Sequence, residues 1–288
     1  MIRSIVVLGA GTMGHGIAYG AAMGGFDTRL YDVSEEVLGR SRSLIDGIGA
    51  KAVELGKVRS NDFESARARL EFVTDLSAAL SGIEMVIEAV PEKMDLKLSV
   101  FQEVERHAPA DAIVASNTSA LSITEISSAL ARPQRVAGMH FFNPVHKMKL
   151  VEVVCALETA PETMDLIEEV AKQMGKETVR IKESPGFVTS RVNAMIGNEA
   201  FYMLQQGIAS ARDIDKALKL GLNHPMGPFE LVDLVGLDTR LSVLEFLHAT
   251  LGEKYRPCPL LIEYVQAGRL GKKVGKGCLL YTSDAADE

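Results

Sequence analysis

The sequence predicts an α/β domain with a parallel sheet over residues 1–183, followed by an all-helical domain over residues 184–277. In the first part, short β-branched apolar runs alternate with amphipathic stretches, which is typical of a parallel sheet with helices on its faces. After the segment Ser184-Pro185-Gly186, apolar residues recur only at helical spacing. The length of 288 residues fits two domains of ordinary size.

The first elements form a compact βαβ unit. Residues 5–8 predict a buried strand, residues 17–23 a helix of small side chains, and residues 28–31 a second strand. Residues 4–26 carry no charged side chain, as in a signal peptide or membrane anchor. The seven glycines of this segment argue against both, because each glycine weakens a helix by roughly 1 kcal/mol relative to alanine.

The later elements continue the alternation. Ser34, followed by two acids, has the features of an N-cap for a long amphipathic helix over residues 37–55. Further strands are predicted at residues 71–73, 85–88, 112–115, 136–139 and 150–154, with amphipathic stretches at 95–108 and 122–130. In the helical domain, Ser210-x-x-Asp213 predicts a helix start and Pro228 a first helical turn.

The composition excludes several function classes. With 47% hydrophobic and 24% charged residues, the chain is too apolar for a disordered protein. Its net charge of −7 offers no basic field to nucleic acid. Cys155, Cys258 and Cys278 are far apart and the histidines lack ligand spacing, so we expect no disulfide framework and no metal site. This cysteine usage indicates a reducing cytoplasm.

A glycine-rich motif lies between the first strand and the first helix. Gly9-Ala10-Gly11-Thr12-Met13-Gly14 matches G-x-G-x-x-G, which provides a tight turn, a close approach to pyrophosphate and a helix N-terminus facing it. Glycine-rich turns also serve flavin, methyl-donor and sugar-nucleotide enzymes. Asp32, at the end of the next strand, would accept from ribose hydroxyls and repel a 2′-phosphate, so the motif predicts a Rossmann-like domain that binds NAD rather than NADP.

A second cluster of polar residues lies near strand ends. His140 directly follows the predicted strand at residues 136–139 and Glu152 lies inside the one at 150–154, and ligands of α/β sheets usually bind near the carboxyl ends of strands. Oxidation of an alcohol needs a base for the hydroxyl proton, and histidine titrates near neutral pH. A glutamate on the other ring nitrogen would fix the tautomer. The alternative is that His140 is only a hydrogen-bonded structural histidine.

The motifs together resemble the L-3-hydroxyacyl-CoA dehydrogenase family, including bacterial 3-hydroxybutyryl-CoA dehydrogenases. The resemblance runs from about residue 3 to Gly277. Besides the glycine motif, the matching segments are Ser116-Asn117-Thr118-Ser119, His140-Phe141-Phe142-Asn143-Pro144, Leu150-Val151-Glu152-Val153, Ser184-Pro185-Gly186-Phe187 and residues 224–231.

The resemblance implies reversible NAD-dependent oxidation of (S)-3-hydroxyacyl-CoA to 3-ketoacyl-CoA, and a homodimer formed through the helical domain. It makes His140 the general acid/base and Glu152 its partner, and lets Ser119 hold the C3 oxygen of the substrate. It places four further residues near the cofactor: Glu92, Lys97, Asn143 and Lys273. For Glu92, Lys97 and Lys273 the alternative is a solvated surface charge.

One position departs from the family pattern. Many members have asparagine in Gly-Phe-x-x-Asn-Arg, where its amide assists substrate binding, but this chain has Ser190. Serine is shorter and offers one hydroxyl instead of an amide. We expect Ser190 to belong to the catalytic site and activity to survive the change, with a water or Asn193 filling the gap.

The CoA end of the site is less clear. Residues 39–60 have a local excess of positive charge, including Lys51 and Lys57, which would suit the CoA phosphates as the corresponding region does in the family. The alternative is a solvated helix face.

Residues 278–288 depart from the family at the chain's end. Members continue Gly-Lys-Gly with an aromatic pair, whereas this segment resembles the translation of a sequencing adapter. We expect a non-native tail that is disordered or loosely packed.

Two other functions fit the same fold. A dehydrogenase of a free hydroxy acid or sugar acid would not need the basic stretch, and a catalytically idle NAD-binding protein would not need Ser119, His140 and Glu152 together. We expect an acyl-CoA substrate, with neither nucleic acid nor membrane as a partner.

Overall fold

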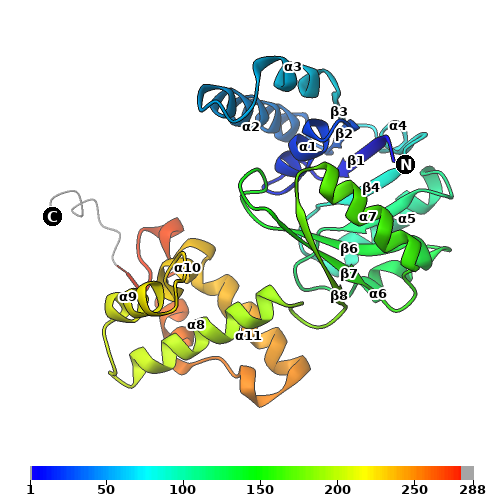
Figure 1. The fold of residues 1–288 in the computed structure, drawn as a ribbon. Coiled ribbons are helices and arrows are strands. Elements are labelled where there is room, and N and C mark those ends of the chain that lie inside the picture. Colours follow the sequence, from blue (N-terminus) through cyan, green and yellow to red (C-terminus); the bar gives the residue numbers. More distant parts are fainter. Residues whose placement is uncertain (1, 280–288) are drawn as a thin grey trace. The chain divides into compact units, whose positions relative to one another are not determined.

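An eight-stranded sheet forms the centre of the first part of the chain (Figure 1). The computed structural model describes residues 2–279, which divide into two units between Ser184 and Pro185. The strands are β1 (Ser4–Leu8), β2 (Asp27–Tyr31), β3 (Leu70–Val73), β4 (Met85–Glu88), β5 (Ile113–Ser116), β6 (Val136–Phe141), β7 (Leu150–Cys155) and β8 (Glu177–Lys182). They lie in the order β3-β2-β1-β4-β5-β6-β7-β8, of which the first six follow the Rossmann order.

The predicted parallel sheet is confirmed, with one antiparallel pairing in it. β7 runs antiparallel to β6, while the other neighbouring strands are parallel. The cause is the connection between them, since β6 ends at Phe141 and β7 begins at Leu150. A parallel crossover needs about a dozen residues or more, and this connection is shorter.

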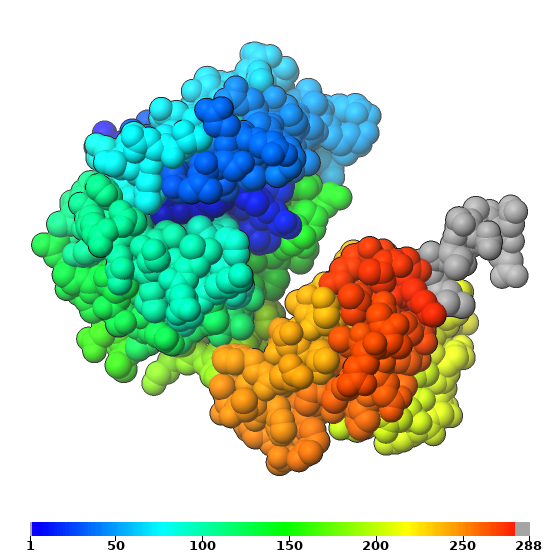
Figure 2. Space-filling model, turned by 180° about the vertical axis from the view of Figure 1, so that it is seen from behind, coloured from blue at the N-terminus to red at the C-terminus, as the bar shows by residue number. Residues whose placement is uncertain are grey.

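Helices cover both faces of the sheet. They are α1 (Gly14–Met23), α2 (Glu35–Glu54), α3 (Ser60–Ala68), α4 (Leu76–Leu80), α5 (Met94–His107), α6 (Ile123–Ser127) and α7 (Pro161–Gln173), with a 3-10 turn η1 (Pro133–Arg135). One apolar core joins α1, α2 and α7 to one face, where Ile5 and Val7 of β1 point. In Figure 2, the cyan and green surface of this unit is formed by the segment that contains α4, α5 and α6.

The uncharged N-terminal segment folds as a strand, a turn and a helix. β1 and α1 contain it, and α1 is almost entirely buried against the sheet. Among the described residues, no helix is both long and apolar enough to cross a membrane.

The second unit is helical, as predicted. Its elements are α8 (Thr189–Gln205), α9 (Ala211–Gly221), α10 (Pro228–Val235), α11 (Leu237–Leu251), α12 (Pro259–Gln266), η2 (Glu253–Tyr255) and η3 (Lys272–Val274). Phe201 packs edge-on against Phe229, with ring centroids 5.2 Å apart, inside one apolar core. Ser210 caps α9 and Pro228 begins α10, as the sequence predicts.

The first residues of the expected tail are well packed, which corrects the prediction for them. The buried carboxylate of Asp233 accepts hydrogen bonds from the backbone N–H of Cys278 at 2.8 Å and of Leu279 at 2.9 Å. Both side chains pack against the helical core. Asp233 also forms a hydrogen bond with the Cys278 thiol, and burial together with this bond raises the pKa of that thiol. Residues 280–288 lie outside the described residues.

Candidate active site

The glycine motif forms a tight loop at the carboxyl end of β1. Gly9 has a φ of +99°, which favours glycine, and a Cβ there would lie 2.8 Å from the carbonyl oxygen of Ala89. A Cβ on Gly14 would lie 1.7 Å from the carbonyl oxygen of Gly9. Both glycines are therefore required by the packing of the loop, α1 and the end of β4.

Gly11 has a different reason to be glycine. A Cβ there would meet nothing within 4 Å, so the fold itself does not require its absence. The loop of Gly11 and Thr12 is exposed, and α1 begins just after Met13 without a side-chain cap or an acid in its first turn. The uncapped amide groups and the open space fit the pyrophosphate of a dinucleotide.

Asp32 is tied to the same loop. One carboxylate oxygen accepts from the backbone N–H of Ala10 at 3.0 Å, and the other accepts from that of Ser34 at 3.0 Å. The hydroxyl of buried Ser41 donates to the carbonyl of Ala10. Ala10 is thus held from both sides, and Asp32 is oriented with lone pairs left for ribose hydroxyls. The residues present therefore fit NAD.

His140 and Glu152 form a buried pair across two strands. They are direct partners in the register of β6 and β7, so their side chains share one face of the sheet. His140 Nδ1 donates to Glu152 Oε2 at 2.8 Å, with Glu152 fully buried and His140 7% exposed. This hydrogen bond fixes the tautomer and directs Nε2 away from Glu152.

Neighbouring groups hold His140 and the end of β6 in place. The ring of Phe142 lies 4.6 Å from the His140 ring, centroid to centroid. Asn117, from the segment after β5, accepts from the backbone N–H of Phe141 at 2.9 Å. Asn143 is exposed and precedes the cis proline Pro144, just beyond the end of β6.

Ser119 is held by Glu92. Glu92 Oε1 accepts from the backbone N–H of Ser119 at 2.8 Å and from its hydroxyl at 3.2 Å. It also accepts from the hydroxyl of Thr118 at 2.5 Å, while Lys97 Nζ lies 3.3 Å from Glu92 Oε2. Burial raises the pKa of Glu92, but the Lys97 charge and the bonds from Thr118 and Ser119 outweigh it and hold the pKa below its usual range.

Lys97 is not a solvated surface charge. It is 1% exposed, and its ammonium donates to Glu88 Oε1 at 2.7 Å. Glu88, which sequence reasoning missed, is the last residue of β4 and is fully buried. The only signal for it was an acid at the carboxyl end of an apolar strand, next to the glycine loop's strand in the sheet.

Two predicted site residues belong to the helical unit. Ser190 lies in the first turn of α8 and is half-buried. Lys273 lies in η3, and its ammonium donates to both carboxylate oxygens of Asp238 at 2.6 Å. This bond holds the pKa of Asp238 below its usual range.

The basic stretch lies on the outer surface of α2 and the segment after it. Lys51 pairs with Glu54 at 2.7 Å, with both side chains more than half exposed, while Lys57 is exposed just beyond α2. Among the described residues, neither lysine has a hydrogen bond or an ion pair with the glycine loop or with His140. Either lysine could meet a CoA phosphate only at this outer surface.

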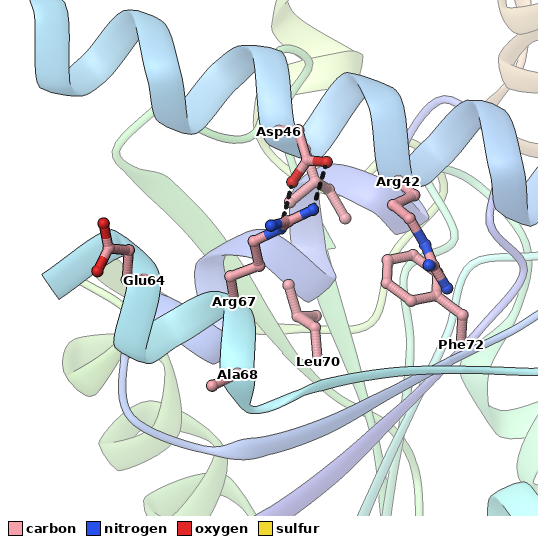
Figure 3. Close-up of a pocket in the computed structure, with 8 residues that line it drawn as sticks. Arg42, Asp46, Glu64, Arg67, Ala68, Leu70 and Phe72 are labelled. Atoms are coloured by element: carbon pink, nitrogen blue, oxygen red, sulfur yellow. Dashed lines mark hydrogen bonds and ion pairs between the residues drawn. The ribbon is translucent and has the colours of Figure 1, made fainter. Parts of the chain in front are cut away.

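A pocket of about 400 Å³ lies beside the same stretch, between α2, α3 and β3 (Figure 3). Arg67 binds Asp46 through two nitrogen atoms, and the Arg42 guanidinium lies 4.5 Å from the ring centroid of Phe72. The pocket contains none of the predicted site residues. Among the described residues, no group of three or more potential ligands is arranged to hold a metal ion.

Comparisons with known proteins match nearly all of the described residues. The model of the 3-hydroxyacyl-CoA dehydrogenase NAD-binding domain matches residues 4–184, and that of the C-terminal domain matches residues 186–281. A probable 3-hydroxybutyryl-CoA dehydrogenase of Bacillus subtilis is 47% identical over 277 residues, covering 96% of each chain. A 3-hydroxybutyryl-CoA dehydrogenase of Bradyrhizobium diazoefficiens is 41% identical, covering 96% of this chain and 94% of its own. The crystal structure of (S)-3-hydroxybutyryl-CoA dehydrogenase from Ralstonia eutropha has a TM-score of 0.95 at 39% identity, covering 98% of this chain and all of its own.

Proposed function

Because the chain belongs to the 3-hydroxyacyl-CoA dehydrogenase family, we propose that it reversibly oxidises (S)-3-hydroxybutyryl-CoA to acetoacetyl-CoA, with His140 as general acid/base. It is an NAD-dependent oxidoreductase, and its substrate is a CoA thioester. The observation that supports the role of His140 best is its buried hydrogen bond to Glu152.

The residues of the first unit supply the cofactor site. Gly9, Gly11, Thr12, Met13 and Gly14 would hold the pyrophosphate, and Asp32 the adenosine ribose. Bound NAD supplies the acceptor for the hydride that leaves C3. Asn143, beyond the end of β6, and Lys273, in the helical unit, are proposed to contact the cofactor as well, as is Glu92.

His140 moves the proton in this proposal. In the oxidative direction the C3 hydroxyl donates its proton to Nε2, while the C3–H electron pair leaves as hydride and the C3–O bond becomes a carbonyl. Glu152 then carries the negative charge that stabilises the positive ring. Because both side chains are nearly or fully buried, water screens this attraction little.

Ser119 holds the C3 oxygen opposite the base. Glu92, which is ionised at neutral pH, accepts from both the backbone N–H and the hydroxyl of Ser119. Because a hydroxyl has one proton to donate, it would turn from Glu92 to the C3 oxygen while the backbone N–H stays on Glu92 and keeps Ser119 in place. Ser190 is proposed to assist the same substrate with a single hydroxyl. A Ser190→Asn variant with an increase in kcat/KM of about a hundredfold would show that this serine is a defect.

Two proposals concern the rest of the substrate and the assembly. Lys51 and Lys57 would bind CoA phosphates, and an unchanged KM for acyl-CoA in Lys51→Ala and Lys57→Ala would remove them from the site. The helical unit would form a homodimer, since Leu220 and Leu222 at the end of α9 are 77% and 67% exposed. Light scattering that gives the mass of a single chain would contradict the dimer.

The cytoplasm remains the proposed location, because the three described cysteines are free thiols.

The decisive assay compares two substrates. Purified protein is mixed with NADH and either acetoacetyl-CoA or free acetoacetate, and NADH absorbance is followed. The proposal predicts turnover with the thioester and little with the free acid. Turnover on an unesterified acid alone would favour a free hydroxy-acid dehydrogenase, and none on any substrate would favour an idle NAD-binding protein.

A further inference from the structure

Two oppositely charged side chains are completely buried beneath the site. Glu88 is 0% exposed and Lys97 is 1% exposed, and Lys97 Nζ lies 2.7 Å from Glu88 Oε1. Removing two charges from water is costly, and an apolar pair of similar volume often stabilises a fold as well or better. Stability alone is therefore a weak reason for this pair.

The carboxylate of Glu88 joins three elements at one edge of the sheet. Besides Lys97, in the first turn of α5, its Oε1 accepts from the backbone N–H of Val90 at 2.7 Å. Its Oε2 accepts from the hydroxyl of Ser116, the last residue of β5, at 2.6 Å. Glu88 is thus fixed by β5 and by the segment that leads from β4 to α5, and it fixes the ammonium of Lys97 in turn.

Lys97, which is held by Glu88, also contacts Glu92. Its ammonium is 3.3 Å from Glu92 Oε2, and Glu92 Oε1 on the other side holds the N–H and hydroxyl of Ser119. A carboxylate group is planar and rigid, so the ammonium on one oxygen restricts the orientation of the other. The contacts run without a gap from Glu88 through Lys97 and Glu92 to Ser119.

We propose that Glu88 is a positioning residue, which acts through Lys97 and Glu92 to orient the Ser119 hydroxyl that holds the substrate's C3 oxygen. This inference rests on the proposed role of Ser119. Without the Glu88 carboxylate, the partners of Lys97 within the described part of the chain are Glu92 and the carbonyl of Val90, 3.5 Å away. The ammonium then moves toward Glu92 and shifts its carboxylate, which displaces the backbone N–H of Ser119 and with it the position of the hydroxyl.

The main variant is Glu88→Gln, with Glu84→Gln as its matched control. Glu84 lies just before the opposite end of β4, and its carboxylate also accepts a backbone N–H, that of Ser4 at 3.1 Å. We expect Glu88→Gln to lower kcat for acetoacetyl-CoA reduction on the order of 10- to 100-fold, because small misplacements of a substrate contact have effects of that size. Because Glu92 is also proposed to contact the cofactor, the Kd for NADH is measured in parallel, and the loss in kcat at saturating NADH should exceed any change in this Kd. Glu84→Gln should match the wild type in both quantities. An unchanged kcat in Glu88→Gln would overturn the proposal.

A double variant separates positioning from stability. Glu88→Gln leaves Lys97 buried with a weaker set of partners and should lower Tm, whereas Glu88→Gln with Lys97→Met removes both charges and should restore it. The proposal predicts that kcat stays low in this double variant. If kcat returned to the wild-type value together with Tm, the pair would be purely structural.

A double-mutant cycle between Glu88 and Ser119 tests whether Glu88 acts through Ser119. In the wild type, Ser119→Ala should lower kcat/KM about tenfold or more, and in the Glu88→Gln background it should lower it much less, since the hydroxyl is already misplaced. Equal effects in both backgrounds would contradict the proposal. An inactive wild type would instead refute the proposed substrate. A fully active Ser119→Ala enzyme would refute the role of Ser119.

If Glu88→Gln does not fold, Ser116→Ala is the replacement variant, because it removes the hydroxyl that donates to Glu88. A wild-type kcat in Ser116→Ala would overturn the inference.

Discussion

Replacing Glu152 with glutamine removes the negative charge beside His140 and keeps the shape of the side chain. The carboxylate is fully buried and its Oε2 is 2.8 Å from His140 Nδ1. The amide can still accept from the ring, but it no longer balances the charge that the ring gains with the proton. We therefore expect a loss in kcat rather than in NADH affinity.

The size of the loss follows from the burial of the pair. Hydrogen bonds to charged groups contribute about 1.5–3 kcal/mol, and here the full range applies because solvent does not screen the pair. At about 1.4 kcal/mol for each factor of ten in rate, kcat should fall about 10- to 150-fold.

The assay is steady-state reduction of acetoacetyl-CoA by NADH, with NADH binding measured separately by fluorescence. Glu158→Gln is the control, since Glu158 is exposed shortly after the same strand. A Glu152→Gln enzyme with kcat within about twofold of the wild type would show that the charge contributes nothing to the transition state.

Three further predictions concern other parts of the chain. Gly11→Ala should leave Tm unchanged, because its Cβ meets no protein atom within 4 Å, but weaken NADH binding about tenfold or more; an unchanged Kd would place the pyrophosphate elsewhere. The folded-state pKa of Glu92 lies below its ordinary value of 4.5, so its ionised form stabilises the fold above that value and the stability is lost as pH falls through the folded pKa. Glu92→Gln should therefore lose less unfolding free energy than the wild type between about pH 6 and about pH 3, and identical losses would rule out this contribution. Asp233→Ala should lower the unfolding free energy of the helical unit by about 1–3 kcal/mol, because the N–H groups of Cys278 and Leu279 lose their acceptor. Denaturant unfolding that matches the wild type would show that these hydrogen bonds do not stabilise the unit.

Local patterns predicted most of the elements near the glycine loop. The tight turn at Gly9 and the packing of Gly14 have steric demands that only glycine meets. The turn could therefore be predicted from the positions of the glycines alone. Gly49, in the interior of α2, lies where a Cβ would be 2.0 Å from the ring of Phe63 in α3. Its reason is a contact with a distant helix, which periodicity cannot show.

The missed features depend on contacts between distant segments. In the sequence, Glu88 is only the last residue of a predicted strand. The fold shows that Lys97 and Ser116 form hydrogen bonds with its carboxylate. Strand β8 also escaped prediction, because it is an edge strand with mostly exposed or half-buried side chains and has no apolar run. The antiparallel direction of β7, in contrast, was accessible from the shortness of its connection to β6.

The most direct test of the account is the rate of His140→Gln, which keeps a polar side chain but cannot take up a proton. General acid–base catalysis contributes about 10²–10⁴-fold, so kcat for acetoacetyl-CoA reduction should fall by at least about 100-fold. The Kd for NADH should stay near the wild-type value, because the glycine loop and Asp32 are untouched. A His140→Gln enzyme that retains more than about a tenth of the wild-type kcat would contradict the assignment of His140 as the acid/base.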